Sequence, residues 1–336
     1  MPWARSPSSC ADPDPALDRI LVTDPIDSAG IALLAEHAEV VRPPETSLDA
    51  IRTIGRDVDA VITRSRLPDD LFEIAPRIRV VMIHGTGTDL VPLASASAHG
   101  VMVANMPGGN AQSVAEYCLM AILLLARNFR LIDGSLRNAA WDVARALAEP
   151  ALEVEKKTLG IVGVGHIGAR LARMCASGLS MRILGNQRRL DLLPQGVEPA
   201  SLKELLAQSD FVVLTCPLTP ETHHLMNAAR LALMKRTAFL VNVGRGPVID
   251  ETALIDALRS NMIAGAMLDV YEHYRLEPDH PLRSLPNAVL TPHLAGSTRE
   301  SRERSGRLAA QETLRMLAGE APISFVNPEC KVNIRK

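Results

Sequence analysis

Three polar side chains stand directly after apolar, strand-like runs in the second half of the chain. Arg245 follows one run and lies between two glycines, Asp269 ends the next, and His293 follows the last. Ligands of parallel sheets bind at the carboxyl ends of strands, so these groups are expected together. A guanidinium can bind a carboxylate and polarise a carbonyl, and an imidazole can pass a proton. Taken singly, Arg245 also fits a surface charge, His293 a loop histidine and Asp269 a helix cap.

A glycine pattern between Thr158 and Gly168 indicates a nucleotide-binding site. Gly163, Gly165 and Gly168 form G-x-G-x-x-G, after a strand-like run and before a helical one. The first glycine permits a tight turn, the second admits a pyrophosphate, and the third brings helix and strand together. The helix amides that begin at His166 and Ile167 then face the phosphates.

A second glycine loop, residues 85–88, follows the run Val80–Ile83 and offers amides to a carboxylate. Arg64, after the run 60–63, is a further candidate for substrate binding. His84 could face substrate or be structural. His223 and His224 lack metal-ligand spacing, so no metal site is expected.

Strand-like and helical segments alternate twice along the chain, which predicts an α/β protein with two doubly wound parallel sheets. The first series precedes the glycine pattern and therefore belongs to a different domain. A long helix at 111–127 is expected to lead into the second domain. Residues 134–150 look less regular; there Trp141 is expected either to be buried or to pack on a second subunit. Ser201 to Glu204 has the form of a capping box.

Composition narrows the class. A length of 336 residues favours two domains, and a net charge of −2 argues against nucleic-acid binding. No apolar run reaches membrane-spanning length. Residues 1–18, rich in Pro, Ser and Asp, are expected to form a flexible tail. Five cysteines without a C-x-x-C pair, among them Cys10 and Cys330 near the termini, favour a reducing cytoplasmic location.

Six ordered motifs resemble the D-2-hydroxyacid dehydrogenase family, and within it the glyoxylate/hydroxypyruvate reductases, from about residue 19 to 328. Besides the glycine pattern they are His84-Gly-Thr-Gly-Thr-Asp89, Ser113-Val-Ala-Glu116, Val241-Asn-Val-Gly-Arg-Gly246, Leu268-Asp-Val270 and Leu290-Thr-Pro-His-Leu-Ala-Gly296. The resemblance implies a flavodoxin-like substrate domain (19–105 plus 297–336), a Rossmann cofactor domain (106–296) and an active site in the cleft between them. The C-terminal helix would complete the first domain.

The resemblance also implies roles for individual residues. Arg245 would bind substrate, His293 would be the acid/base, and the amides of Thr86 and Gly87 would hold the substrate carboxylate. Asp269 would bind the nicotinamide carboxamide, and Cys216 and Pro217 would pass beneath the cofactor. Further cofactor contacts are expected from Ser113, Thr222, Val243 and Gly296.

One position departs from the family pattern. A Glu five residues after the Asp of Leu-Asp-Val normally pairs with the catalytic His, and an ungapped count places Tyr274 there. Because Asp279-His-Pro-Leu282 continues in register, Tyr274 is favoured as the neighbour of His293, with Glu272 and Glu277 as alternatives. Formate dehydrogenases of the superfamily carry a neutral Gln at this position.

A second departure concerns the cofactor. Gln187 stands where an acidic residue normally binds the adenosine ribose of NAD, and Arg188 and Arg189 follow it. This arrangement predicts a preference for NADP(H), with NAD(H) as the alternative.

The expected function is reduction of a small 2-oxo acid by a homodimer. Two alternatives stay open: a dehydrogenase of another donor, of the formate or phosphite type, and a nucleotide-sensing binding protein resembling the carboxyl-terminal-binding corepressors. The absence of long low-complexity tails weighs against the second alternative.

Overall fold

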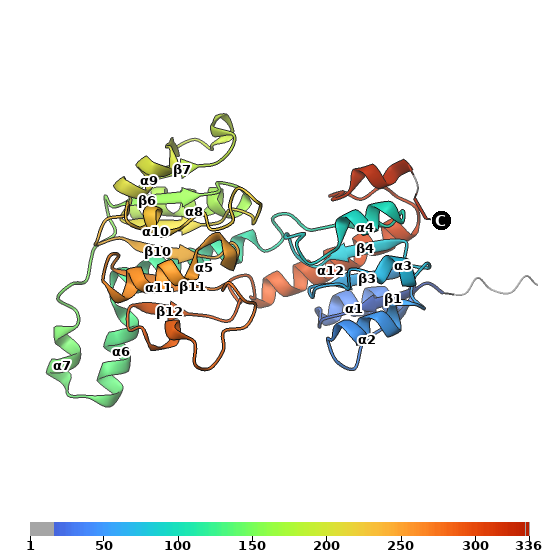
Figure 1. Cartoon of the computed structure of the whole chain (residues 1–336), viewed down its shortest axis with the longest axis horizontal. Coiled ribbons are helices and arrows are strands. Elements are labelled where there is room, and N and C mark those ends of the chain that lie inside the picture. Colours follow the sequence, from blue (N-terminus) through green and yellow to red (C-terminus); the bar gives the residue numbers. More distant parts are fainter. Residues whose placement is uncertain (1–16, 333, 336) are drawn as a thin grey trace, which may run out of the picture. The chain divides into compact units, whose positions relative to one another are not determined.

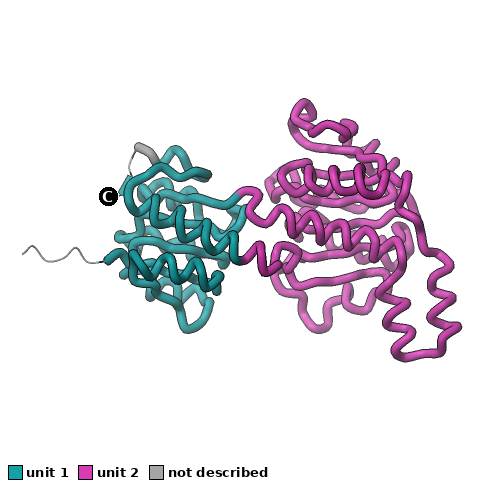
Figure 2. The backbone as a smooth tube through the Cα atoms, turned by 180° about the vertical axis from the view of Figure 1, so that it is seen from behind, with its two compact units in different colours: residues 1–106, 303–336 teal, residues 107–302 magenta. Residues whose placement is uncertain are grey.

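The computed structural model describes residues 17–332 and 334–335. The expected tail, most of which lies at residues 1–16, and Cys10 fall outside the described residues. The chain divides into two compact units, unit 1 with residues up to 106 and from 303 onward, and unit 2 with residues 107–302 (Figure 2).

Unit 1 is a parallel five-stranded sheet in the order β2-β1-β3-β4-β5, the order of flavodoxin-like folds. Its strands are β1 (Arg19–Val22), β2 (Glu39–Val41), β3 (Ala60–Thr63), β4 (Val80–Ile83) and β5 (Met102–Ala104). The helices connecting or following them are α1 (Ser28–Ala35), α2 (Leu48–Gly55), α3 (Leu71–Ile74), α4 (Leu93–Ala98) and α12 (Arg299–Leu317), with the final 3-10 turn η4 (Pro328–Val332) (Figure 1).

Side chains alternate between the two faces of this sheet. Ile20 and Val22 of β1 pack into one apolar cluster, whereas Leu21 packs into the other. The first cluster includes Ala309 of α12, so the C-terminal helix completes unit 1 as expected. Helix α12 approaches α1 so closely that a Cβ on Gly30 would lie 2.5 Å from the carbonyl oxygen of Gly306.

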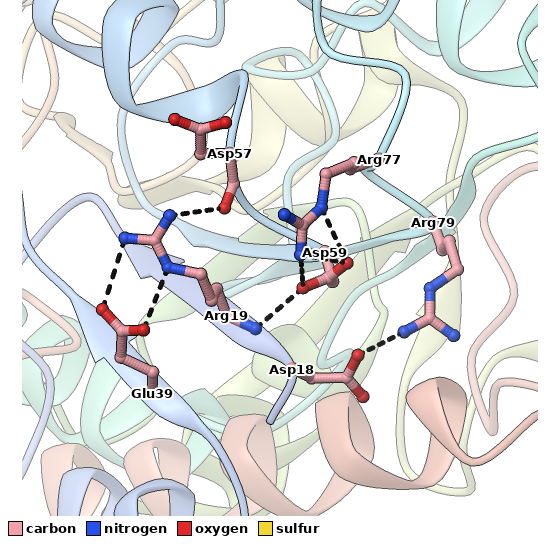
Figure 3. A network of polar contacts seen from close by, with 7 residues as sticks. All are labelled: Asp18, Arg19, Glu39, Asp57, Asp59, Arg77 and Arg79. Atoms are coloured by element: carbon pink, nitrogen blue, oxygen red, sulfur yellow. Dashed lines mark hydrogen bonds and ion pairs between the residues drawn. The ribbon is translucent and has the colours of Figure 1, made fainter. Parts of the chain in front are cut away.

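Ion pairs and hydrogen bonds connect the amino ends of the strands of unit 1 (Figure 3). The nearly buried carboxylate of Asp59 accepts hydrogen bonds from the Arg19 amide at 2.8 Å and from the Arg77 guanidinium at 3.0 Å. Arg19 also binds Glu39 at 3.0 Å, and Arg79 binds Asp18 at 2.6 Å. Because ligands bind parallel sheets at the carboxyl ends, we assign this network to stability.

Unit 2 is a parallel seven-stranded sheet in the order β12-β11-β10-β9-β6-β7-β8, which is the Rossmann order with one further strand. Its strands are β6 (Thr158–Val162), β7 (Arg182–Asn186), β8 (Glu198–Pro199), β9 (Phe211–Leu214), β10 (Phe239–Asn242), β11 (Gly265–Leu268) and β12 (Ala288–Leu290). Its helices are α5 (Ala111–Ala126), α6 (Phe129–Asn138), α7 (Trp141–Ala146), α8 (His166–Leu179), α9 (Leu202–Gln208), α10 (Ala228–Leu231) and α11 (Glu251–Arg259), with 3-10 turns η1 (Leu190–Leu192), η2 (Gly246–Val248) and η3 (Pro281–Ser284). The prediction of two parallel α/β sheets is confirmed, and so is the capping box at Ser201.

The prediction that residues 134–150 are irregular is wrong, because most of this segment is helical. It lies largely within α6 (Phe129–Asn138) and α7 (Trp141–Ala146). No residue of α6 is buried, and Trp141 is 66% exposed. The alternative of a buried Trp141 is therefore also wrong. Phe129, Leu131, Ile132 and Leu136 recur at helical spacing in α6, so the helical period was present, but none of these side chains is buried among the described residues.

Candidate functional site

The glycine pattern has the geometry that a pyrophosphate site requires. Gly163 adopts a positive φ of 93°, and a Cβ there would lie 2.6 Å from the amide nitrogen of Cys216. A Cβ on Gly168 would lie 2.8 Å from the Gly163 carbonyl oxygen, whereas one on Gly165 would meet nothing within 4 Å. Helix α8 begins at His166 with Gly165 as its N-cap. The first and third glycines close the turn, and the second leaves the space that a nucleotide phosphate would need.

The segment before α5 lies beside this turn. A Cβ on Gly108 would approach the His166 ring to 3.1 Å, and one on Gly296 would lie 2.6 Å from the Asn110 side chain. Ser113 shares a hydrogen bond of 3.0 Å with Thr298. The structure thus brings His166, Ser113 and Gly296, all predicted cofactor contacts, to the same edge of unit 2.

The loop that carries Arg245 is fixed by a buried amide. The side chain of Asn242, at the end of β10, accepts from the Gly244 amide at 3.1 Å and donates to the Arg245 carbonyl at 3.0 Å. A Cβ on Gly244 would lie 2.7 Å from the Cys216 carbonyl, and one on Gly246 would collide with the Tyr271 carbonyl. The neighbouring backbone therefore leaves no room for a side chain at either of the two glycines that flank Arg245.

Asp269 organises the loop that carries His293. Its buried carboxylate accepts from the Thr291 hydroxyl at 2.7 Å and from the amides of Leu294 and Ala295 at 2.8 and 2.9 Å. The His293 amide donates to the Asp269 carbonyl at 2.9 Å, and His293 has a positive φ of 54°. Non-glycine residues hold this conformation only where their surroundings enforce it. Asp269 thus fixes a loop rather than capping a helix.

Tyr274 contacts His293. Their ring centroids lie 6.1 Å apart, and the rings meet edge to face at 68°. Of the alternatives, Glu272 binds Nε2 of His224 through Oε1 at 3.0 Å. The described contacts therefore place Tyr274 against the imidazole and engage Glu272 elsewhere.

Other predicted cofactor residues have structural partners. The Thr222 hydroxyl accepts from the Thr219 amide and donates to the Pro217 carbonyl, both at 2.7 Å, which folds the loop after β9. Burial raises the pKa of the Cys216 thiol to about 11, so the thiol is protonated at neutral pH. Val243 is half-buried beside Arg245.

At the end of β7, the Gln187 side chain donates to the Arg189 carbonyl at 2.7 Å. Arg189 forms a two-point pair with the Asp191 carboxylate at 2.9 and 2.7 Å. Arg188 lies near Glu221, whose pKa is lowered chiefly by a hydrogen bond from Thr219 and slightly by the charge of Arg188.

In unit 1 the predicted substrate residues lie at the carboxyl ends of the strands. Within the described part of the chain, the amides of Thr86 and Gly87 donate to no acceptor, which suits them to bind an anion. Asn105 holds this loop by donating to the Thr86 carbonyl at 2.7 Å. Arg64 follows β3, and its amide donates to Asp24 at 3.0 Å.

His84 is buried beside this loop, and neither ring nitrogen has a hydrogen-bond partner among the described residues. Burial, and to a smaller extent the nearby charge of Arg64, lowers the pKa of the His84 imidazole to about 4. The ring is therefore neutral at physiological pH.

Sequence reasoning missed Asn242 and Thr291 because their roles depend on loop contacts. Their positions at or just after strand ends were the one available signal.

Residues 119–295 match the family model of the D-isomer specific 2-hydroxyacid dehydrogenase NAD-binding domain. A glyoxylate reductase of Korarchaeum cryptofilum is 38% identical over 93% of this chain and 96% of its own length. A glyoxylate reductase of Thermococcus onnurineus is 39% identical over 95% of this chain and 98% of its own length. An NADPH-dependent glyoxylate/hydroxypyruvate reductase from Sinorhizobium meliloti, solved with NADP and malonate, has a TM-score of 0.81 and 29% identity, covering 96% and 99%.

The chain belongs to the D-isomer specific 2-hydroxyacid dehydrogenase family. It is an oxidoreductase with a nicotinamide dinucleotide cofactor, and its reaction is reduction of a 2-oxo acid to the 2-hydroxy acid, or the reverse.

Among the described residues, no helix has the length and apolar character needed to cross a bilayer.

Proposed function

We propose that this protein reduces a small 2-oxo acid of the glyoxylate or hydroxypyruvate type with NADPH. The observation that carries the proposal is a pair of loops held by buried polar side chains. Asn242 holds the loop that presents Arg245 after β10, and Asp269 holds the loop that presents His293 after β12. The names of the relatives from Korarchaeum cryptofilum and Sinorhizobium meliloti support this substrate class.

Each polar group has a distinct task in this proposal. Arg245 binds the substrate carboxylate and polarises the ketone. His293 donates the proton to the developing alkoxide, and Tyr274 orients its ring through the edge contact. The amides of Thr86 and Gly87 hold the carboxylate, and Arg64 adds positive charge beside the loop.

The bound nicotinamide supplies the hydride. Gly165, His166, Ile167 and Gly168 would hold the pyrophosphate at the start of α8. Asp269, whose Oδ2 accepts one hydrogen bond from Ala295, would accept a second from the carboxamide. The remaining cofactor contacts in this proposal are Gly163, Ser113, Cys216, Pro217, Thr222, Val243 and Gly296.

The preference for NADPH over NADH rests on the end of β7. Gln187 lacks the carboxylate that would repel a 2′-phosphate. Since Arg189 already binds Asp191, we assign the larger share of phosphate binding to Arg188.

We further propose that the units described above are the substrate and cofactor domains, that the chain forms a homodimer, and that it works in the cytoplasm. The exposed apolar side chains of α6 and α7, Phe129, Leu136, Trp141 and Val143, support the dimer. The four cysteines of the described residues are free thiols, which supports a reducing compartment.

The test is NADPH oxidation across a panel of 2-oxo acids, with formate and NADP⁺, and phosphite and NADP⁺, as separate arms. We expect turnover with glyoxylate or hydroxypyruvate. Turnover only with formate or phosphite would replace the proposal with the other-donor alternative. Tight NADPH binding with no turnover in any arm would favour a nucleotide-sensing protein.

A further inference from the structure

Two neighbouring histidines and a distant glutamate form a cluster on unit 2. His223 and His224 belong to the loop after β9, and Glu272 follows β11, 48 residues beyond His224. Nε2 of His224 lies 3.0 Å from Oε1 of Glu272. One ligand atom from each of the three side chains lies within 4.8 Å of the others. The imidazoles stack with centroids 4.0 Å apart.

The backbone fixes the direction of His224. This residue has a positive φ of 47°, and its amide donates to the Pro247 carbonyl at 2.8 Å. A parallel bridge between Met226 and Ile249 secures the following residues. A non-glycine residue in this conformation is strained and is kept there by its surroundings.

The backbone of Glu272 is held just as firmly. Its amide donates to Oε2 of Glu251 at 3.2 Å, and Oε1 of Glu251 lies 2.9 Å from Nε2 of His280. The main chain that carries the Glu272 carboxylate is thus held by a second carboxylate–imidazole pair. Such outer contacts orient ligands in known metal sites.

An ion pair between His224 and Glu272 would involve only one of the two imidazoles. Two imidazole nitrogens and one carboxylate oxygen are, in contrast, a familiar ligand set for zinc, with a fourth position left for water. With bonds of about 2.1 Å, two ligand atoms of one zinc lie at most about 4.2 Å apart. The ligand atoms of this cluster lie within 4.8 Å of one another, and rotation of the exposed His223 side chain can bring them to the shorter separation.

We propose that His223, His224 and Glu272 bind a divalent transition-metal ion, Zn²⁺ in particular. This replaces the expectation of no metal, which considered only the adjacent histidines. The ion would connect the loop of Thr222 to the segment of Tyr274, since Thr222 adjoins His223 and Glu272 precedes Tyr274 by two residues. Zn²⁺ would therefore restrain two segments near the proposed catalytic residues without taking part in the reaction.

The test is equilibrium dialysis of the full chain against Zn²⁺ at about pH 7.5, where imidazoles are neutral enough to bind. Every protein carries Cys10→Ser, which removes the thiol outside the described residues. The first variant is His224→Asn, because Asn tolerates the left-handed backbone but lacks the imidazole. His223→Ala and Glu272→Gln remove the other ligands, and His37→Ala removes an exposed histidine of unit 1 as a control.

We expect one Zn²⁺ per chain in the parent and in His37→Ala. Each ligand variant should lose about tenfold or more in affinity. Zn²⁺ should also raise the melting temperature of the parent but not of His224→Asn. The proposal is overturned if the parent binds no Zn²⁺, or if His224→Asn and His223→Ala both bind it as tightly as the parent does.

Discussion

The ring of Tyr274 meets the ring of His293 edge to face, with centroids 6.1 Å apart. In the proposed correspondence with the family pattern, this phenol takes the position of the carboxylate. A neutral phenol can orient the imidazole, but it does not stabilise the imidazolium as a carboxylate would. Reduction consumes the proton of that imidazolium, so activity is lost as the pH rises. We expect this loss to begin at a lower pH than in relatives that carry Glu.

Tyr274→Glu is expected to move the falling limb of the kcat/KM profile for 2-oxo acid reduction to higher pH. The new carboxylate would favour the charged imidazole. Tyr274→Phe, which keeps the ring contact, is the control and should leave the limb in place. An unchanged profile in a folded Tyr274→Glu variant that still binds substrate would contradict the assignment and favour Glu277, since Glu272 is engaged by His224.

Arg245→Ala is expected to lose far more activity than Arg245→Lys, with cofactor binding retained in both. Lysine keeps the charge but not the planar fork. A charge-assisted contact contributes about 1.5–3 kcal/mol, so the loss in kcat/KM for Arg245→Ala should be about tenfold to a hundredfold or more. Steady-state kinetics would measure it, with Arg259→Ala, at an exposed residue of α11, as the control. Unchanged kcat/KM in Arg245→Ala would remove Arg245 from the site.

Fluorescence titration should show tighter binding of NADPH than of NADH. Arg188→Ala is expected to weaken the binding of NADPH by about tenfold to a hundredfold and to change the binding of NADH little. Arg189→Ala should have the smaller effect, because Arg189 is paired with Asp191. Gln187→Asp should shift the preference toward NADH. If the parent binds NADH as tightly as NADPH, the cofactor proposal is wrong.

His84 should make the protein sensitive to acid. Its pKa is about 4 in the folded chain, against about 6.5 when exposed, so the unfolded chain binds a proton first as pH falls. Stability is then lost as pH falls from about 6.5 through 4, by up to about 1.4 kcal/mol per pH unit. Urea unfolding across this range should show a shallower loss for His84→Leu than for the parent. Equal slopes would mean that His84 does not titrate as described.

Light scattering at micromolar concentration is expected to give the mass of two chains. The exposed apolar side chains of α6 and α7 are the proposed contact, so Leu136→Asp should favour the monomer. Leu192→Asp, at another exposed leucine, is the matched control. A single-chain mass for the parent would refute the dimer.

The buried strands were predictable because each is a short apolar run between turns, as at Val80–Ile83. The edge strand at Glu39–Val41 was missed because three residues with one exposed carboxylate form no recognisable pattern. The site residues that could be predicted are those that belong to recognisable sequence motifs. Asn242, Thr291 and the partner of His224 could not be predicted, because their contacts depend on how distant segments fold together.

The exposure of Trp141 gives the protein a built-in optical reporter. The sequence has two tryptophans, and Trp3→Phe would leave Trp141 as the sole indole emitter. A solvated indole emits at longer wavelength than one covered by apolar side chains. Burial of α7 against another surface would therefore appear as a blue shift of the emission with rising protein concentration, without any added label.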